Sequence, residues 1–427
     1  MGFSLAEIRA SKLLTNDGRI LFSTRAVRLF AYGLLSVVLA LYLAAIGLNE
    51  TQIGLLLSLT LAGDMVISLA ITAVADRVGR RRMLQIGAVL VVFAGTVFAR
   101  TRYLPLLTIA AIIGTISPSG NEVGPFLAIE QAALTQILPG EFRTRAFAWY
   151  SLVGSLATAL GSLCGGLLAQ SFQRITGEIL AGYRAVIVLY ALLGAVLLLL
   201  FTRLSASTEI DKLPAPPVPS IRPLAMGWVG LHHSRRFVFK LSGVFMLDAF
   251  AGGLIVQSLV AYWFHVRFGV HPGILGGIFF GANIFAGISA LAAARIANRI
   301  GLVNTMVWTH VPSNLLLMLV PLMPNLPLAI AVLLARFSIS QMDVPTRQSY
   351  TMAVVDPDER SAAAGVTNVA RTAASSLAPL ITGGMFGAAL LSLPFFLSGG
   401  LKIIYDLLLY RGFRSIRPPE EQRHQAP

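Results

Sequence analysis

The sequence predicts an all-α membrane protein with 12 transmembrane helices in two pseudo-symmetric six-helix bundles. Three observations predict this fold class. Of the 427 residues, 56% are hydrophobic and only 12% are charged, whereas a soluble domain carries about 25% charged residues. Twelve apolar runs follow one another, and most are long enough for a span of roughly 20 residues. Motifs in the first six runs recur in the last six.

The apolar runs are predicted to be helices because lipid offers no partner to an unpaired backbone N–H or C=O group. We place them at 26–48, 51–74, 83–99, 103–138, 146–170, 182–203, 239–266, 272–294, 302–323, 326–355, 361–386 and 389–410. The predicted domains are an N-terminal bundle at 1–203, a polar, proline-rich cytoplasmic linker at 204–238, and a C-terminal bundle at 239–427 with a short cytoplasmic tail. The segment "GWVGLHHSRRF" in the linker could form a short interfacial helix.

The formal net charge of +14 would suggest a nucleic-acid partner in a soluble protein. In a membrane protein, an excess of Lys and Arg marks the cytoplasmic segments. With the N-terminus inside, the 33 Lys and Arg residues divide into 24 in cytoplasmic segments, five of them N-terminal, five in outside segments and four within spans. The sequence therefore predicts a multi-pass protein of the cell (plasma or inner) membrane with cytoplasmic N- and C-termini, and no nucleic-acid partner.

The fourth apolar run, 103–138, is too long for one span. Its 36 residues would extend about 54 Å as a single helix, against a hydrocarbon core of roughly 30 Å. It contains "SPSGNEVGP" at 117–125, whose prolines and glycines break or kink a helix. A break at membrane depth is tolerated where it is buried in protein or lines a water-filled cavity.

The turn between the second and third spans reads "ADRVGRRRM" at 75–83. Gly79 permits a tight reversal. Asp76 ends the second span and can cap a neighbouring helix N-terminus, where negative charge is favoured. The arginines keep the turn in the cytoplasm, where they can pair with carboxylates or lipid headgroups. A second copy, "ANRIGLVNT", occupies the same place in the C-terminal half.

A second pair of segments also repeats: "RTRAFAWYSL" at 143–152 matches "RSAAAGVTNV" at 360–369, an offset of 217. Such internal repeats are typical of transporters, in which the substrate site lies near the middle of the membrane at the repeat interface.

The turn resembles that of the major facilitator superfamily, whose pattern there is G-x-x-x-D-R-x-G-R-R. Thr72 replaces the leading glycine, and the matching residues are Asp76, Arg77, Gly79, Arg80 and Arg81. The resemblance implies alternating access by rocking of the two bundles. It also implies that the turn is a gating motif that latches the cytoplasmic side in the outward-facing state. The alternative is that the arginines are only topology signals.

The family's antiporters also carry G-x-x-x-G-P-x-x-G-G on the fifth span. Here the positions hold Ala157, Gly161, Ser162, Gly165 and Gly166. Close helix packing explains these small residues as well as an antiporter pattern does. Many proton-coupled members have an arginine on the fourth span, which this sequence lacks apart from Arg102 at its rim.

Ionisable and polar residues inside the spans are the candidate site, because charges at membrane depth are costly and usually functional. Glu122 either exchanges protons or satisfies the loosened backbone of the broken segment. Glu130 is a second relay group or, as we favour, the partner of Arg371. The predicted substrate and proton pathway comprises Asn121, Glu122, Glu130, Asp248, Gln257, Asn283, Asp343, Arg347 and Arg371.

Two further pairs lie four residues apart and so share one helix face. Asp343 and Arg347 are predicted to form a structural ion pair that a charged substrate could exchange. Lys402 and Asp406 have the same spacing and are treated as structural. Asp64 in the second span could be buried structure or part of the cavity.

The sequence predicts a secondary active transporter of a small organic molecule, with proton-coupled efflux as the leading hypothesis and import by a nutrient or metabolite symporter as the alternative. No G-x-x-x-x-G-K-[ST] signature occurs, so a gradient must supply the energy. An intramembrane enzyme is the remote alternative, because H-E-x-x-H is absent. We expect no enzymatic activity, cofactor or metal site, and a functional monomer. In-span carboxylates outnumber in-span cations six to four, which favours a neutral or cationic substrate.

Overall fold

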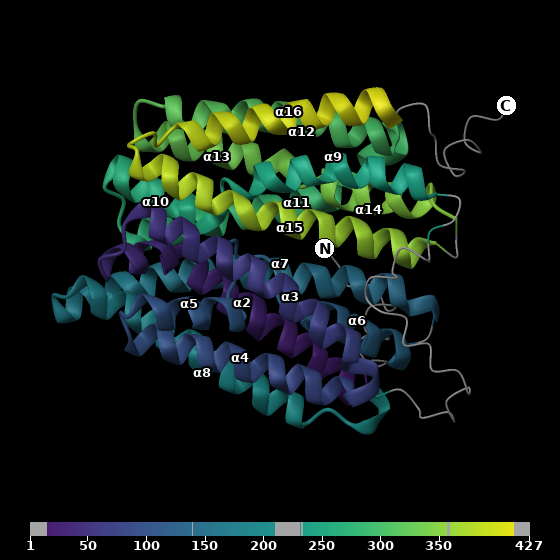
Figure 1. Ribbon diagram of the computed structural model, residues 1–427, viewed down its shortest axis with the longest axis horizontal. Helices are drawn as coiled ribbons and strands as arrows, with labels where there is room; N and C mark the ends of the chain where they lie inside the picture. The colour runs from purple at the N-terminus through teal and green to yellow at the C-terminus, as the bar shows by residue number, and fades with distance from the viewer. Residues whose placement is uncertain (1–14, 139, 210–230, 232–233, 357–358, 414–427) are drawn as a thin grey trace, which may run out of the picture. The chain divides into compact units, whose positions relative to one another are not determined.

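The computed structural model describes residues 15–138, 140–209, 231, 234–356 and 359–413. Within these ranges the regular structure is helical (Figure 1), which confirms the predicted all-α fold class. Of the predicted interfacial helix at 227–237, residues 227–230 and 232–233 lie outside the described ranges. The rest leads directly into the first helix of the C-terminal half.

Each predicted span of the N-terminal half corresponds to helix in the structure, and the fourth span is broken as predicted. The helices are α2 (Asn16–Ala45), α3 (Glu50–Val78), α4 (Arg80–Arg100), α5 (Leu104–Ile113), α6 (Phe126–Ile137), α7 (Gly140–Thr176) and α8 (Ile179–Thr202), followed by the short helix η1 (Ala206–Thr208). The fourth span consists of α5 and α6 with the non-helical segment 114–125 between them. This segment holds the "SPSGNEVGP" run.

The C-terminal half repeats this order. Its helices are α9 (Arg235–Gly253), α10 (Gln257–Phe268), α11 (Pro272–Ile300), α12 (Leu302–Leu319), η3 (Val320–Leu322), α13 (Leu326–Ser340), α14 (Asp343–Ala353), α15 (Arg360–Gly387) and α16 (Leu393–Phe413). Within the described residues, ten helical stretches are long and apolar enough to cross a membrane. The broken fourth span and the more polar α15 complete the twelve.

The same helix pairs pack together in both halves. In the first half, α2 packs chiefly on α7 and α4 packs on α8, as Figure 1 shows for α4 and α8. In the second half, α9 packs chiefly on α15 and α12 packs on α16. These are the first and fifth, and the third and sixth, spans of each repeat. The shared pairing supports the predicted pseudo-symmetry of the two six-helix bundles.

Glycines bring the backbones of α2 and α7 close together. A Cβ atom added to Gly161 would lie 2.1 Å from the carbonyl oxygen of Phe30, and one added to Gly165 would lie 2.3 Å from that of Leu34. No side chain fits such a gap, and small residues are what close helix contacts in membranes require. Two positions of the fifth-span pattern are therefore explained by packing alone.

The chain divides into two compact units. Unit 1 comprises Met1–Leu48, Leu59–Ala215 and Gly269–Phe280, and unit 2 comprises Asn49–Ser58, Pro216–Phe268 and Gly281–Pro427. The start of α3 thus groups with unit 2, and the start of α11 groups with unit 1. The domain boundaries at 203 and 239 stay a prediction.

Candidate functional site

The turn between α3 and α4 depends on a glycine, as expected. Gly79 has φ +115° and lies directly before α4, and Gly301 has φ +86° and lies directly before α12. Backbone at positive φ strains other residues but not glycine. The two copies of the repeated motif therefore use the same device to begin the third span of each half.

The cap of α4 is not the predicted one. The backbone N–H groups of Arg80 and Arg81 donate to the two carboxylate oxygens of Glu209, at 2.7 and 3.0 Å. A carboxylate there satisfies unpaired donors and complements the helix dipole. The prediction that Asp76 caps a helix N-terminus is wrong, because its carboxylate instead accepts from Arg80 Nε at 2.9 Å.

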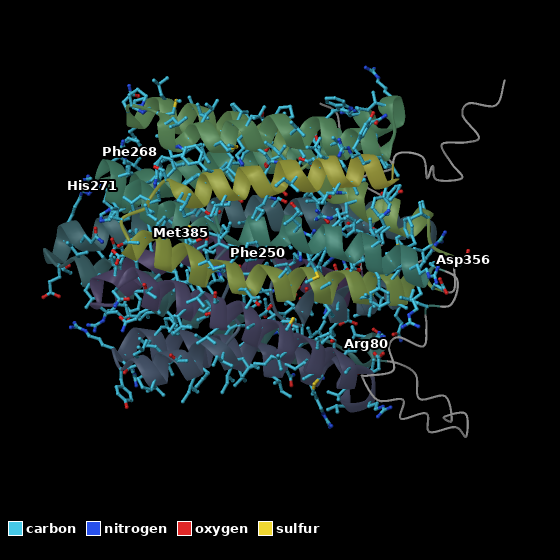
Figure 2. The ribbon with its side chains drawn as sticks, turned by 45° about the horizontal axis from the view of Figure 1, so that its top comes forward. Arg80, Phe250, Phe268, His271, Asp356 and Met385 are labelled. Carbon is cyan, nitrogen blue, oxygen red and sulfur yellow. The ribbon has the colours of Figure 1, made fainter. Side chains whose placement is uncertain are left out.

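Further contacts tie this turn to the ends of other helices in unit 1. The Arg80 guanidinium donates to Gln136 Oε1 on α6 at 2.8 Å. Arg81 Nη2 donates to the carbonyl oxygen of Thr202 at the end of α8, at 2.6 Å. The side chain of Arg77 is exposed. Figure 2 shows Arg80 at one end of its helices.

The first buried charge cluster lies in unit 1, and we call it the Arg28 cluster. It consists of Arg25 and Arg28 on α2, Glu122 in segment 114–125, Glu130 on α6 and Tyr150 on α7. Arg28 binds Glu130 through two nitrogen atoms, at 2.8 and 2.6 Å, and Glu122 through Nε at 2.8 Å. Arg25 donates to Glu122, and the Tyr150 hydroxyl donates to Glu130. The side chains of Arg28 and Glu130 are fully buried.

Two predictions are corrected by this cluster. The five predicted N-terminal cytoplasmic charges include Arg25 and Arg28, but α2 begins at Asn16 and both residues lie within it. Glu130 binds Arg28 inside unit 1 and Arg371 binds Asp248 inside unit 2, so each member of the favoured Glu130–Arg371 pair has another ionic partner. With these two arginines added to the four in-span cations, cations equal the six in-span carboxylates. The charge argument for a neutral or cationic substrate therefore fails.

The broken segment 114–125 is held by side chains from several helices. The Tyr32 hydroxyl donates to the carbonyl oxygen of Val123 at 3.2 Å, and the Tyr190 hydroxyl donates to that of Thr115. These bonds satisfy backbone groups that the break leaves unpaired, as a membrane interior requires. Asn121 is exposed within this segment.

The second charge cluster lies in unit 2, and we call it the Asp248 cluster. Its members are Asp248 on α9, Asp343 and Arg347 on α14, Arg371 on α15 and Lys402 on α16. The Asp248 carboxylate accepts from Lys402 at 2.6 Å, from Arg371 at 3.0 Å and from Arg347 at 3.1 Å. Arg347 also donates to Asp343 at 2.8 Å, which confirms the predicted ion pair.

Lys402 and Asp406 share one helix face, but Lys402 binds Asp248. Asp406 is fully buried and lies 2.9 Å from His310 Nδ1 and 3.2 Å from Asn314 Nδ2. Sequence reasoning missed His310. Its one visible signal is that it is the single titratable side chain in the run 302–323.

The two clusters occupy equivalent spans with opposite charges. The first and fourth spans contribute Arg28 and Glu130, whereas the seventh and tenth contribute Asp248 and Arg347. Glu130 and Arg347 are separated by 217 residues, the same offset as the repeated segment that begins at Arg143. Each repeat thus holds its first span to its fourth span by an ion pair, with the charges exchanged.

Two further predicted pathway residues, Gln257 and Asn283, form a hydrogen bond in unit 2. Asn283 Nδ2 donates to Gln257 Oε1 at 3.4 Å, and both side chains are partly buried. Among the residues that the structure describes, no group of three or more His, Cys, Asp or Glu residues could hold a metal ion.

Twelve spans in two repeats, with buried ion-pair clusters inside them, define the class of secondary membrane transporters. A sequence model of the Major Facilitator Superfamily matches residues 21–379. The chain belongs to the Major Facilitator Superfamily, as its resemblance predicted, and this family implies a transporter rather than an enzyme.

The chain is also similar to three individual proteins. It is 32% identical over 423 residues to "Uncharacterized membrane protein YJR124C" of Saccharomyces cerevisiae, covering 93% of this chain and 94% of that protein. It is 26% identical over 143 residues to the "Quinolone resistance protein NorA" of Staphylococcus aureus (strain Mu50), covering 34% of this chain and 36% of NorA. The crystal structure of the nucleoside transporter NupG matches with a TM-score of 0.72 at 14% identity, covering 94% of this chain and 100% of that one, which shows the fold.

Proposed function

We propose that this chain exports a small organic molecule in exchange for protons, by alternating access, as a monomer in the cell membrane with both termini cytoplasmic. The observation that carries the proposal is the pair of buried charge clusters, one in each unit. The similarity to NorA, a quinolone resistance protein by name, favours export over import.

Energetics support a functional role for the clusters. Removing two charges from water costs several kcal/mol per ion, and apolar residues of similar volume often stabilise a protein as well or better. Inside a membrane such groups mark substrate and ion pathways. Stability alone therefore gives little reason to keep ten charged or phenolic side chains in these two clusters.

Each cluster has one charged member that is more accessible than the others. In the Arg28 cluster it is Glu122, whose side chain is 14% exposed, and in the Asp248 cluster it is Arg371, whose side chain is 23% exposed. These two residues are the proposed points at which substrate or water reaches the clusters. The remaining members hold them in place through the contacts described above.

The turn at 75–83 is the proposed gate. The contacts of Arg80 and Arg81 join the ends of α3, α4, α6 and α8 on one side of unit 1. Breaking these contacts would free the helix ends to move. Glu209 is a further member of the proposed gate, because it caps α4 from beyond the sixth span.

A pH gradient across proteoliposomes tests direction and coupling together. Purified protein is reconstituted, a fluorescent quinolone serves as the first probe, and a panel of small organic molecules follows. We expect the probe to accumulate when the interior is acidic, because an antiporter moves substrate against the flow of protons. Accumulation only when the interior is alkaline would indicate a symporter and overturn proton exchange. Protein-free liposomes are the control.

A further inference from the structure

Among the described residues of unit 1, one carboxylate in the middle of a span has no Arg, Lys or His partner. This is Asp64 of α3, whose carboxylate accepts a hydrogen bond from Ser68 Oγ at 3.4 Å and lies near the backbone N–H of Gly124. Every other in-span carboxylate of the predicted site or its neighbouring pairs has such a partner: Glu122, Glu130, Asp248, Asp343 and Asp406.

The position of Asp64 makes an unpaired charge costly. It lies 14 residues from each end of α3 (Glu50–Val78), which is about 21 Å along the helix in either direction. The residue is 9% exposed. A lone carboxylate in so apolar a place avoids the cost of desolvation by taking up a proton.

The groups around Asp64 do not compensate its charge. Tyr32 on α2 and Tyr190 on α8 lie within electrostatic range, but their hydroxyl groups donate to carbonyl oxygens of segment 114–125. Glu122 in the same segment is also negative and disfavours a second negative charge nearby. The two cations that α2 contributes to this network are also bound: Arg25 to Glu122, and Arg28 to Glu122 and Glu130.

Helix α5 contributes no charge at the level of Asp64, and Arg371 of α15, the helix on which the start of α3 packs, is bound to Asp248. Gly63 packs on the backbone of α5, where an added Cβ would lie 2.1 Å from the carbonyl oxygen of Ile112. Helix α5 (Leu104–Ile113) carries no titratable side chain. Helix α4 carries none between Arg82 and Arg100.

Asp64 is linked to the Arg28 cluster through the broken fourth span. Gly124, whose N–H lies near the Asp64 carboxylate, has φ +83° and follows Glu122 by two residues. An ionised carboxylate accepts a hydrogen bond more strongly than a neutral acid. A change of protonation at Asp64 therefore changes how firmly segment 114–125 is held beside Glu122, Arg25 and Arg28.

We propose that Asp64 binds and releases the proton that this transporter exchanges for its substrate. The inference rests on the proposed function and assigns its proton to one residue. A carboxylate oxygen of Asp64 takes a proton from water on one side of the membrane. The acid loses the same proton to water on the other side, while the substrate moves in the opposite direction.

A carbodiimide tests protonation without any transport. N,N′-dicyclohexylcarbodiimide reacts with protonated carboxylic acids in apolar surroundings, and the modified residue is identified by mass spectrometry. The full-length protein in proteoliposomes is treated at values from about pH 6 to about pH 9. We expect modification at Asp64 that falls as the pH rises, and none at the ion-paired Glu130. Modification of Asp64 that does not change with pH would overturn the proposal.

An infrared measurement covers the case in which the reagent does not reach Asp64. The carbonyl stretch of a protonated acid is recorded as a difference between low and high pH, for the wild type and for Asp64→Asn. We expect a band that the substitution removes. Absence of both the band and the chemical modification would show that Asp64 does not exchange a proton.

Transport separates this inference from the proposed function. With the probe that the wild type accumulates, Asp64→Asn is expected to lose accumulation driven by the pH gradient and to keep exchange of labelled for unlabelled probe. Asp64→Glu should restore part of the gradient-driven uptake, and Glu178→Gln, an exposed carboxylate, should change nothing. Full gradient-driven uptake by Asp64→Asn would refute the role of Asp64 alone. If accumulation of the probe by the wild type did not depend on the pH gradient, proton exchange itself would be refuted.

Discussion

Replacing Asp248 with asparagine is expected to abolish transport and to lower the free energy of unfolding by about 3–5 kcal/mol. Asp248 is the common anion of Lys402, Arg347 and Arg371, at 2.6, 3.1 and 3.0 Å. Its side chain is 4% exposed. Neutralising it leaves buried cations without their counter-charge, which is far more costly than losing an exposed pair. Probe flux in proteoliposomes and thermal unfolding in detergent measure the two effects.

The matched variants isolate charge from shape. Asp248→Glu keeps the charge and should retain more stability than Asp248→Asn. Combining Asp248→Asn with Lys402→Met removes one charge of each sign, and it should be less destabilising than the sum of the single changes, because residues in contact couple. Additive effects of the two substitutions would show that the Asp248–Lys402 contact does not stabilise the fold.

Replacing Arg28 with methionine is expected to lower the free energy of unfolding by a similar amount, about 3–5 kcal/mol. Here the buried groups that lose their counter-charge are carboxylates rather than cations. Methionine retains much of the side-chain volume but leaves Glu130 without its two-point partner and Glu122 with Arg25 alone. Both Arg28 and Glu130 are fully buried. We expect a lowered Tm and little protein in the membrane, measured by thermal unfolding and by quantitative immunoblotting. Adding Glu130→Gln should recover part of the stability.

Asp76→Asn is the control for this prediction. It removes an ion pair with Arg80 at 2.9 Å, but the Asp76 side chain is 61% exposed. Such pairs contribute about 0.2–1 kcal/mol, so protein abundance should stay near that of the wild type. Because Asp76 belongs to the proposed gate, transport should fall nonetheless. If Arg28→Met lowered the free energy of unfolding as little as Asp76→Asn does, the Arg28 cluster would not be what stabilises unit 1.

The fold could be predicted from hydrophobicity and helix geometry. Most of the twelve apolar runs are long enough for a span, and the fourth is too long and too rich in proline and glycine for one helix. The structure accordingly places the break at 114–125, between α5 and α6. Ion pairs within one helix can also be predicted from the sequence, because the four-residue spacing of Asp343 and Arg347 places both on one helix face.

Contacts between helices could not be predicted in the same way. The rotation of one helix against its neighbour decides whether Lys402 meets Asp406 on its own helix or Asp248 on α9. A single sequence does not contain that rotation. Arg25 and Arg28 were misplaced for a related reason: the polar first turns of α2 concealed that this helix begins at Asn16.

The break in the seventh span was also missed, although its signal is local. Helix α9 ends at Gly253 and α10 begins at Gln257. The pair Gly252 and Gly253 stands at the break, and glycine pairs are a common site of kinks. An added Cβ on Gly253 would lie 2.5 Å from the carbonyl oxygen of Ser375, so close packing on α15 requires glycine here.

Alternating access requires the broken fourth span to meet water from each side of the membrane in turn. Asn121 is exposed in that segment, and Cys164 is the only cysteine of the chain. The most direct measurement is therefore the labelling of Asn121→Cys, in a Cys164→Ser background, by a membrane-impermeant maleimide added to one side at a time. We predict labelling from both sides, with the ratio shifted by the imposed pH gradient. Labelling from neither side, or from one side only under every gradient, would contradict a passage that opens alternately.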